Sequence, residues 1–368
     1  MTYHVCIVAG ARPNFIKVAP LIRAIRNAEG IDYKLVYTGK EGDTTIEGTL
    51  FDDLQIPMPD VYLGVACGSL NELTGKVMGE FEHYLEQYPT DTVVVVDDLA
   101  STMAAAIVTK KRGVRLAHLV AGTRSFDISM PKEVNRLVID GLSDLLFTAG
   151  ISNNSITNRE GAEQSRVYMV GNILIDNLRF NHSRWQRPRL MADWQLADGG
   201  YIVFTLNRKA LVSETENLQR MLEAMTAAAA GMPIVAPLRG DARRAVEEIV
   251  RTRMSECPHL ASIRLVDSLS YLEFGYLTAN AKGIVTDSGN VAEEATFNAV
   301  PCITLNSYTE HIETVKAGSN VLVGEDADKL RAAVDEMVNG KWKKCSLPER
   351  WDGRTAERIV RILVEKSL

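Results

Sequence analysis

Short apolar runs alternate with longer segments of helical period along the first 150 residues of the chain. The runs are rich in β-branched residues and are apolar on both faces, which is typical of buried parallel strands joined by helical crossovers. They are YHVCIVAG (3–10), KLVYTG (34–39), TVVVVDD (92–98), RLAHLVAG (115–122) and DLLFTAG (144–150). This part of the chain is therefore predicted to form a parallel α/β sheet.

The pattern restarts after a polar interruption at residues 179–200, which carries Trp185, Pro188 and Trp194 and ends in Gly-Gly, as an interdomain connection would. The later runs are YIVFTLN (201–207), PIVAPL (233–238), IRLVD (263–267), AKGIVTDSG (281–289), VPCITL (300–305) and NVLVG (320–324). We predict two Rossmann-like, doubly wound α/β domains that face each other across a cleft at their strand ends. The predicted boundaries are 1–172, with a C-terminal helix at 353–368 packing back on this domain, and 173–352.

The composition and charge of the chain narrow the range of functions that we expect. A net charge of −6 gives no overall basic field for nucleic acid, and no run approaches the roughly 20 apolar residues of a membrane span. We expect a cytoplasmic protein. The five cysteines lack any ligand spacing, so neither a zinc site nor a cofactor is predicted, although Asp97 and Asp98 together could hold a divalent ion.

Two strand-to-helix turns carry candidate anion sites. In VAGARPNFIK, Arg12 and Lys17 stand beside a helix N-terminus, where backbone N–H groups favour phosphate; a solvated loop with ordinary surface charges is the alternative. In TDSGNVAEEA, Ser288 and Gly289 open a helix, and Glu293 or Glu294 could accept from a ribose diol. The alternative there is that Asp287 and Ser288 merely cap the helix.

These motifs, in this order, resemble those of the non-hydrolysing UDP-N-acetylglucosamine 2-epimerases, a family with a glycosyltransferase-B-like fold. The similar segments run through nearly the whole chain: GARPNFIKVAPLI, YTGKEGDTTIEGTLFDDLQIPMPDVYLGV, TGKVMGEFE, HLVAGTRSFDISMPKEVNR, LSDLLFTA, VGNILIDNL, TLNRK, TDSGNVAEEA and TEHIETVKAGSNVLVG.

The resemblance implies roles for individual residues. Nucleotide binding would fall to Arg12, Lys17, Arg208, Ser288, Gly289 and Glu294, with Arg12 and Lys17 near the phosphates and Glu294 on the ribose. The candidate catalytic residues are Asp98, Lys132, Glu133, Arg136 and Asn207. The expected ligand is a UDP-sugar, such as a UDP-N-acetylhexosamine, and the expected assembly is a homodimer.

The chain also departs from the family pattern. A glutamate is expected at Val120, a second glutamate at Lys132, a histidine at Asn207 and an arginine at His311. In the family, UDP leaves C1 while the C2 proton is removed, a reaction that needs positioned acid/base groups and cations on the diphosphate. Valine has no titratable proton, lysine reverses a charge, and asparagine does not shuttle protons near pH 7.

Three functions therefore remain open. The first is a divergent enzyme that acts at C1 of a nucleotide sugar, by glycosyl transfer or UDP release. The second is a true 2-epimerase that uses Asp98 and Glu133, and the third is a non-catalytic nucleotide-sugar-binding or partner protein. We interpret His118, at a strand end, as a structural hydrogen-bonding histidine rather than a base.

Overall fold

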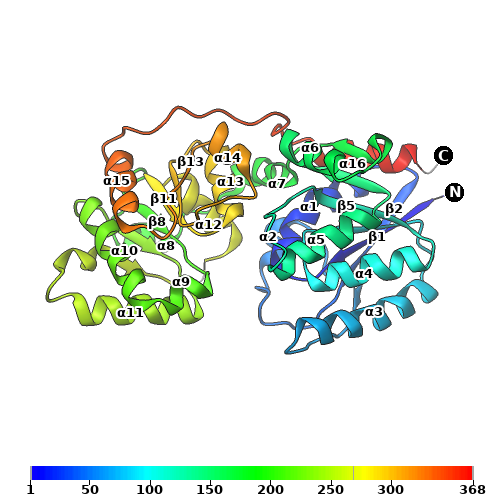
Figure 1. Cartoon of the computed structure of the whole chain (residues 1–368), viewed down its shortest axis with the longest axis horizontal. Helices are drawn as coiled ribbons and strands as arrows, with labels where there is room; N and C mark the ends of the chain where they lie inside the picture. Colours follow the sequence, from blue (N-terminus) through cyan, green and yellow to red (C-terminus); the bar gives the residue numbers. More distant parts are fainter. Residues whose placement is uncertain (1, 268, 367–368) are drawn as a thin grey trace. The chain divides into compact units, whose positions relative to one another are not determined.

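The structure is a computed structural model that describes residues 2–267 and 269–366. The chain forms two compact units (Figure 1): unit 1 comprises Met1–Asn181 and Glu349–Leu368, and unit 2 comprises His182–Pro348. The predicted boundaries lay at 172/173 and 352/353. The first boundary of the structure is later because α7 (Ile173–Asn181) packs against α1 (Arg12–Arg26) and α16 (Thr355–Glu365), which belong to unit 1.

Unit 1 is built on a parallel sheet in the strand order β3-β2-β1-β4-β5-β6-β7. Its strands are β1 (Tyr3–Ala9), β2 (Ile31–Tyr37), β3 (Val61–Tyr62), β4 (Thr92–Val96), β5 (Arg115–Ala121), β6 (Leu145–Thr148) and β7 (Val167–Met169). Every residue of the central β4 is buried, as expected for a strand covered on both faces. The five runs predicted in this part of the chain are confirmed as strands; the short edge strands β3 and β7 were not predicted.

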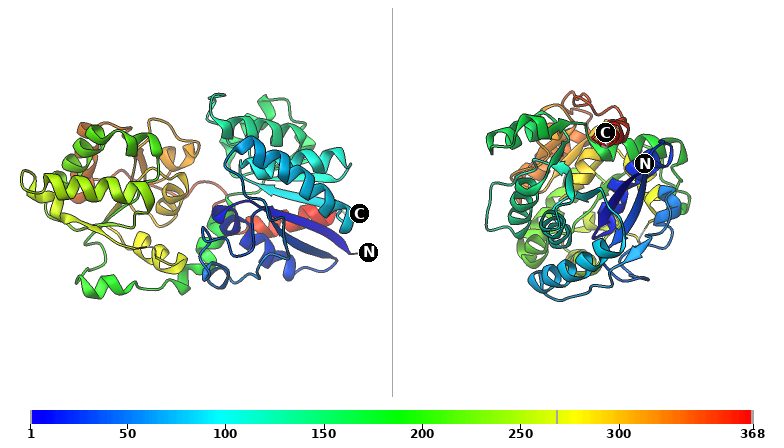
Figure 2. Two further views of the ribbon diagram at one scale, coloured as in Figure 1. Left: turned by 90° about the horizontal axis from the view of Figure 1, so that it is seen from below. Right: turned by 90° about the vertical axis from the view of Figure 1, so that its right-hand side faces the viewer.

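Helices cover both faces of this sheet (Figure 2). On one face lie α3 (Leu70–Gln87), α4 (Ala100–Lys111) and α5 (Pro131–Leu142), which share an apolar core with β1, β4 and β5. On the other, α1 packs with α7 and α16, so the prediction that the C-terminal helix returns to the N-terminal domain is confirmed. The remaining helices of unit 1 are α2 (Leu50–Leu54), α6 (Ile151–Arg159) and the 3₁₀ turn Gln164–Arg166.

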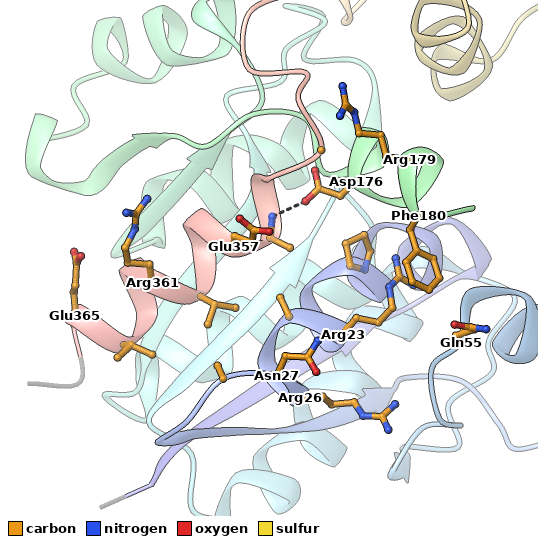
Figure 3. A pocket seen from close by; sticks show the side chains of 17 residues that line it. Arg23, Arg26, Asn27, Gln55, Asp176, Arg179, Phe180, Glu357, Arg361 and Glu365 are labelled. Carbon is orange, nitrogen blue, oxygen red and sulfur yellow. Dashed lines mark hydrogen bonds between the residues drawn. The ribbon is translucent and has the colours of Figure 1, made fainter. Parts of the chain in front are cut away.

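The C-terminal helix α16 is capped by a side chain from α7. Asp176 Oδ1 accepts from the backbone N–H of Thr355 at 3.1 Å. Asp176 Oδ2 accepts from the backbone N–H of Ala356 at 2.7 Å (Figure 3). A pocket of about 1040 Å³ lies beside this junction, lined by residues of α1, α7 and α16. These bonds satisfy helix N–H groups that have no partner within the helix.

Unit 2 repeats the architecture with the parallel strand order β10-β9-β8-β11-β12-β13. Its strands are β8 (Ile202–Phe204), β9 (Ile234–Ala236), β10 (Ile263–Leu265), β11 (Gly283–Thr286), β12 (Cys302–Thr304) and β13 (Asn320–Leu322). All six predicted runs contain one of these strands. In both sheets the strand order reverses beside the first strand, which places the ligand site of such folds at the carboxyl ends of the central strands.

Two apolar clusters fill the two faces of the unit 2 sheet. One contains side chains of α9 (Lys209–Ser213), α10 (Thr215–Ala228), α11 (Gly240–Arg253) and α15 (Ala327–Val338). The other contains side chains of α8 (Arg189–Asp193), α12 (Tyr271–Ala279) and α13 (Gly289–Phe297). The remaining elements are α14 (Ile312–Lys316) and the 3₁₀ turns His182–Arg184 and Pro258–Ser262.

Candidate functional site

The candidate site of unit 1 lies where the neighbouring strands β1, β4 and β5 end. Asp97 and Asp98 directly follow β4, and residues 122–130 connect β5 to α5. Because parallel strands end at the same edge of a sheet, the loops after these three strands lie side by side.

Asp97 holds a buried lysine at this edge. Lys17, on α1, is 6% exposed, and its Nζ lies 2.6 Å from Asp97 Oδ1. Asn14 Nδ2 donates to Asp97 Oδ2 at 3.0 Å, and Asn14 Oδ1 accepts from the Gly10 N–H at 2.9 Å. A buried ammonium needs such a partner because desolvation penalises an unpaired charge. The phosphate-binding role expected of Lys17 stays a prediction.

Arg12, the other cation expected near the phosphates, opens α1. Its Nε lies 2.5 Å from Glu47 Oε2, and both side chains are about a quarter exposed, at 28% and 23%. The structure thus pairs Arg12 with the segment that precedes α2.

Asp98 meets three side chains of α5, two of which, Arg136 and Lys132, are among the predicted catalytic residues. Arg136 donates to Asp98 Oδ2 from Nε at 2.8 Å and from Nη2 at 2.5 Å. Lys132 Nζ lies 3.9 Å from Asp98 Oδ1, and Asn135 Nδ2 donates to the Asp98 carbonyl oxygen at 2.8 Å. Positions 132, 135 and 136 share one helix face, so α5 presents two cations and an amide to the same aspartate.

Glu133 also lies here, but both of its oxygens are engaged. Oε2 accepts from the Ser125 N–H at 2.9 Å, the Ser125 hydroxyl at 3.0 Å and Arg136 Nη1 at 3.1 Å, while Oε1 accepts from the Phe126 N–H at 2.9 Å. Burial by itself raises the pKa of Glu133, but the hydrogen bonds from Ser125, Phe126 and Arg136 lower it below the usual glutamate value. Glu133 therefore anchors the loop after β5 as a carboxylate; its catalytic role stays a prediction.

Val120 stands in a backbone conformation that disfavours valine. Its φ is 73°, and the register of β5 against β6 shifts between Leu119 and Ala121. A β-branched residue at positive φ is a clear outlier, and such strain concentrates at functional sites. The resemblance expects a glutamate here, so a bent strand end carries a hydrocarbon side chain where an acid is expected.

The candidate site of unit 2 is the N-terminus of α13. Ser288 is the N-cap, and its hydroxyl accepts from the Val291 N–H at 3.5 Å. A Cβ atom added to Gly289 would lie 2.5 Å from His311 Cδ2, so the imidazole covers the first turn. His311 Nδ1 lies 2.9 Å from Glu293 Oε1, and the neighbouring Glu294 is 7% exposed. The predicted Ser288, Gly289, Glu294 and His311 are thus together.

Asp287 ties this helix start to the segment after β8. Its Oδ2 accepts from the backbone N–H groups of Asn207 at 2.8 Å and Arg208 at 2.6 Å. Arg208 Nη1 lies 3.0 Å from Asn306 Oδ1 and 3.0 Å from Glu325 Oε1. Both predicted residues of the TLNRK motif therefore belong to the same strand-end region as Ser288.

Comparison with known proteins decides the family. The profile of the family described as UDP-N-acetylglucosamine 2-epimerase matches residues 23–364. A UDP-N-acetylglucosamine 2-epimerase of Methanocaldococcus jannaschii is 34% identical over 366 residues, which cover 97% of this chain and 98% of that one. This chain belongs to the UDP-N-acetylglucosamine 2-epimerase family.

Solved structures of the family agree with the fold. The M. jannaschii enzyme in complex with UDP-GlcNAc and UDP superposes with a TM-score of 0.85 and 33% identity, over 98% of this chain and 99% of that one. Another family relative, a UDP-2,3-diacetamido-2,3-dideoxy-D-glucuronate 2-epimerase of Pseudomonas aeruginosa, is 32% identical over 327 residues, covering 88% of this chain and 89% of its own. The predicted glycosyltransferase-B-like fold of two parallel-sheet α/β domains is confirmed.

Two further observations apply to the described residues. No helix within 2–267 and 269–366 is long and apolar enough to span a membrane. Over the same residues, no group of three or more His, Cys, Asp and Glu side chains is arranged to hold a metal ion.

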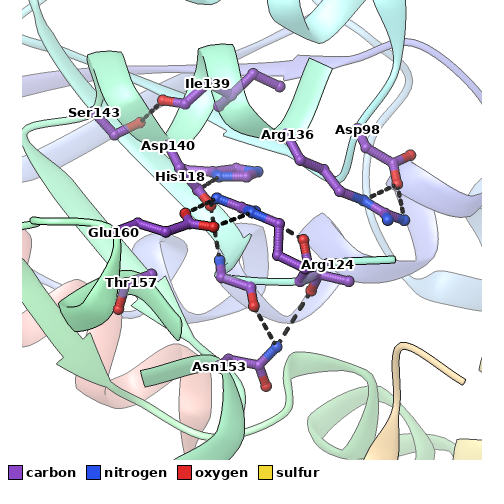
Figure 4. A network of polar contacts seen from close by, with 12 residues as sticks. Asp98, His118, Arg124, Arg136, Ile139, Asp140, Ser143, Asn153, Thr157 and Glu160 are labelled. Atoms are coloured by element: carbon purple, nitrogen blue, oxygen red, sulfur yellow. Dashed lines mark hydrogen bonds and ion pairs between the residues drawn. The ribbon is translucent and has the colours of Figure 1, made fainter. Parts of the chain in front are cut away.

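Sequence reasoning missed a buried polar network behind the unit 1 site (Figure 4). Asp140 on α5 contacts His118 and Arg124, and Arg124 also pairs with Glu160. One signal was available: polar residues at 133, 136 and 140 recur at helical spacing on the buried face of α5, where apolar residues are the rule.

Proposed function

We propose that this family member binds a UDP-sugar and acts at C1 of the sugar, by UDP release or glycosyl transfer, with the proton shuttle of the 2-epimerase reaction altered. The observation that carries the proposal is the pair of substitutions at the unit 1 site. Val120 and Lys132 put a hydrocarbon and a cation where the family resemblance expects acids, while Lys17, Asp98 and Arg136 are kept.

The geometry around Asp98 supports chemistry that needs cations more than a base. Arg136 binds Asp98, and the ammonium of Lys132, with a side chain that is 66% exposed, lies near it. Cleavage at C1 breaks the C1–O bond and leaves its electron pair on UDP, so it is favoured by positive charge near the departing phosphate. Water or an acceptor hydroxyl then bonds to C1 and loses its proton. No proton leaves C2 in this sequence.

The nucleotide would be held by unit 2. The N-cap Ser288 and the N-terminus of α13 offer backbone N–H groups and a favourable helix dipole to a diphosphate. The buried Glu294 on the same helix is assigned to the ribose hydroxyls. The UDP-GlcNAc and UDP complex of the M. jannaschii relative supports this ligand class.

The experiment is a time course of UDP release followed by ³¹P NMR. UDP-GlcNAc and the diacetamido-glucuronate UDP-sugar are each mixed with the protein, with and without candidate acceptor alcohols. We expect UDP to appear faster than in a protein-free control, and an E294A variant to need more substrate for the same rate. No turnover of any substrate, despite UDP binding by calorimetry, would contradict C1 chemistry and favour a non-catalytic binding protein.

True 2-epimerase activity is the second candidate, and the 34% identity to the M. jannaschii epimerase together with the retained Asp98 favours it. Asp98 and Glu133 would then handle the C2 proton. The combined variant V120E/K132E/N207H, which restores the expected acids and imidazole, offers a gain-of-function test. Under the C1 proposal it gains C2 proton exchange that the parent lacks; equal exchange in both proteins would favour the epimerase.

We also propose that the protein forms a homodimer in the cytoplasm. Light scattering after gel filtration tests the assembly, since a dimer has twice the 40.6 kDa chain mass.

A further inference from the structure

Four ionisable side chains lie behind the unit 1 site and take no part in the proposed reaction. His118, Arg124 and Asp140 have side chains that are 2%, 1% and 6% exposed, and Glu160 is 36% exposed. Asp140 is the hub of this cluster, which we call the His118 network. Its Oδ1 lies 2.6 Å from His118 Nδ1, and its Oδ2 lies 2.7 Å from Arg124 Nη2 and accepts from the Gly122 N–H at 3.1 Å (Figure 4).

The hydrogen-bond partners of His118 favour one protonation state of the ring. His118 Nε2 lies 2.9 Å from the carbonyl oxygen of Asp97, which can only accept. On the other side, Nδ1 faces the Asp140 carboxyl group, whose second oxygen lies 2.7 Å from Arg124 Nη2 and accepts from the Gly122 N–H. The positive guanidinium of Arg124 favours the ionised form of this carboxyl group. With Asp140 ionised, both ring nitrogens face acceptors, and both contacts are then hydrogen bonds only if each nitrogen carries a proton.

The charges around the ring allow this state. Asp140 on α5 faces His118 directly, and Arg124 from the β5–α5 loop binds the same carboxylate. Glu160, after α6, pairs with Arg124, while the Asp97 carboxylate on the β4 side is paired with Lys17. With a protonated His118, the network holds two positive and two negative charges. Burial alone raises the pKa of Asp140, but the charge and hydrogen bond of His118, followed by those of Arg124, lower it.

We propose that His118 is a buried imidazolium and a positioning residue, which holds the turn that presents Asp98 to the site. Its Nε2–H holds the Asp97 carbonyl, and Asp97 has a φ of 58°, a left-handed conformation that needs support from its surroundings. The peptide so held is the one that leads into Asp98. Through Asp140, the same network also holds Gly122, at the start of the neighbouring loop.

The inference goes beyond the proposed function because it concerns the free protein and does not depend on which reaction occurs. Its first test is ¹⁵N NMR of protein labelled at its six histidines, recorded at pH 7 without ligand. The H118Q variant assigns the signal by its disappearance, and elimination with the five other His→Gln variants assigns it if H118Q does not fold. Two protonated nitrogens are expected; a neutral ring with one bare nitrogen would overturn the proposal.

The D140N variant sharpens this test. Its amide can turn an N–H group toward His118 Nδ1, so the ring is expected to become the neutral Nε2–H tautomer while keeping its bond to Asp97. A ring that stays doubly protonated in D140N would refute the role of Asp140. H83Q is the matched control, because the His83 side chain is 69% exposed and lies outside the network.

Hydrogen exchange tests the positioning role. The Asp97 N–H donates to the Leu119 carbonyl at 3.3 Å, and the held turn protects it. Glutamine carries its N–H groups on a single nitrogen, so H118Q cannot serve both acceptors, and we expect the amides of 97–98 to exchange at least about tenfold faster. D140N, which keeps the Nε2–H bond, and H83Q should leave their rates unchanged. Unchanged exchange in H118Q, or equal acceleration in D140N, would overturn the positioning role.

Discussion

Substitution of Glu133 by glutamine tests directly whether the Glu133 carboxylate anchors the loop after β5. Glu133 is 2% exposed and accepts from two backbone N–H groups, a hydroxyl and Arg136. In E133Q one oxygen remains, but the new NH₂ group must face at least one of these donors. Hydrogen bonds to a charged group contribute about 1.5–3 kcal/mol, and removing one partner of a buried charged pair costs about 3–5 kcal/mol. We expect E133Q to lower the unfolding free energy of unit 1 by about 3–5 kcal/mol.

The assay is a urea titration followed by hydrogen-exchange mass spectrometry of peptides from β4 and β5, because a whole-chain signal would mix the two units. The matched control is E82Q, since the Glu82 side chain is 52% exposed and its nearest cation, Arg112, lies 3.6 Å away. Surface substitutions of this kind stay within about 0.5 kcal/mol. An E133Q effect as small as that of E82Q would refute the anchoring role of Glu133.

The difference in unfolding free energy between wild type and E133Q should depend on pH, because the pKa of Glu133 is lowered in the folded state. A carboxylate with a lowered folded-state pKa contributes its full stability above the ordinary glutamate pKa of about 4.3 and loses it as the pH falls through the folded-state value. The gap between wild type and E133Q should therefore be constant from pH 5 to pH 7 and close at lower pH. A gap that grows on acidification would contradict this account.

Three further predictions concern other parts of the chain. Burial raises the pKa of Asp176 to about 6, so its contribution to stability is complete near pH 4 and declines as the pH rises through about 6. Denaturation of wild type and D176N across this range should show that wild type loses its stability advantage. A constant difference between the two proteins would contradict this prediction. E294A should weaken UDP binding by about 1–3 kcal/mol in calorimetry, and unchanged affinity would remove Glu294 from the nucleotide site. V120G should change the unfolding free energy by less than about 1 kcal/mol, because the relief of backbone strain offsets the loss of packing. V95G, in the buried strand β4, should lower the unfolding free energy by more than about 3 kcal/mol. Equal losses would show that Val120 is not strained.

The sequence was sufficient for the fold because the relevant signals are local. Each central strand is an apolar run such as TVVVV in β4, and the polar stretch after residue 178 separates two such series. Strands β3 and β7 escaped prediction because two or three partly buried residues at a sheet edge make no distinct pattern. The position of α7 could not be read either, because it depends on packing against α16, which is distant in sequence.

The candidate site was predictable only in part. The family resemblance put Asp98, Lys132, Glu133 and Arg136 in one catalytic set, and these side chains lie together in the structure; their catalytic roles stay predictions. The sequence gave no sign that Glu133 is saturated with hydrogen bonds, because several of its donors are backbone groups of the preceding loop. For the His118 network, the polar residues at 133, 136 and 140 were the available signal, and the partners could not be predicted because they lie on separate elements and meet only in the folded unit.

If this member of the 2-epimerase family acts at C1, as proposed, it leaves the C2 proton of its substrate in place. The most direct measurement is ¹H NMR of UDP-N-acetylglucosamine incubated with the protein in D₂O, with the M. jannaschii relative as the positive control. We predict that UDP is released while the C2 position of the remaining substrate keeps its proton. Deuterium at C2, with the 2-epimer accumulating as it does with the control enzyme, would contradict the account.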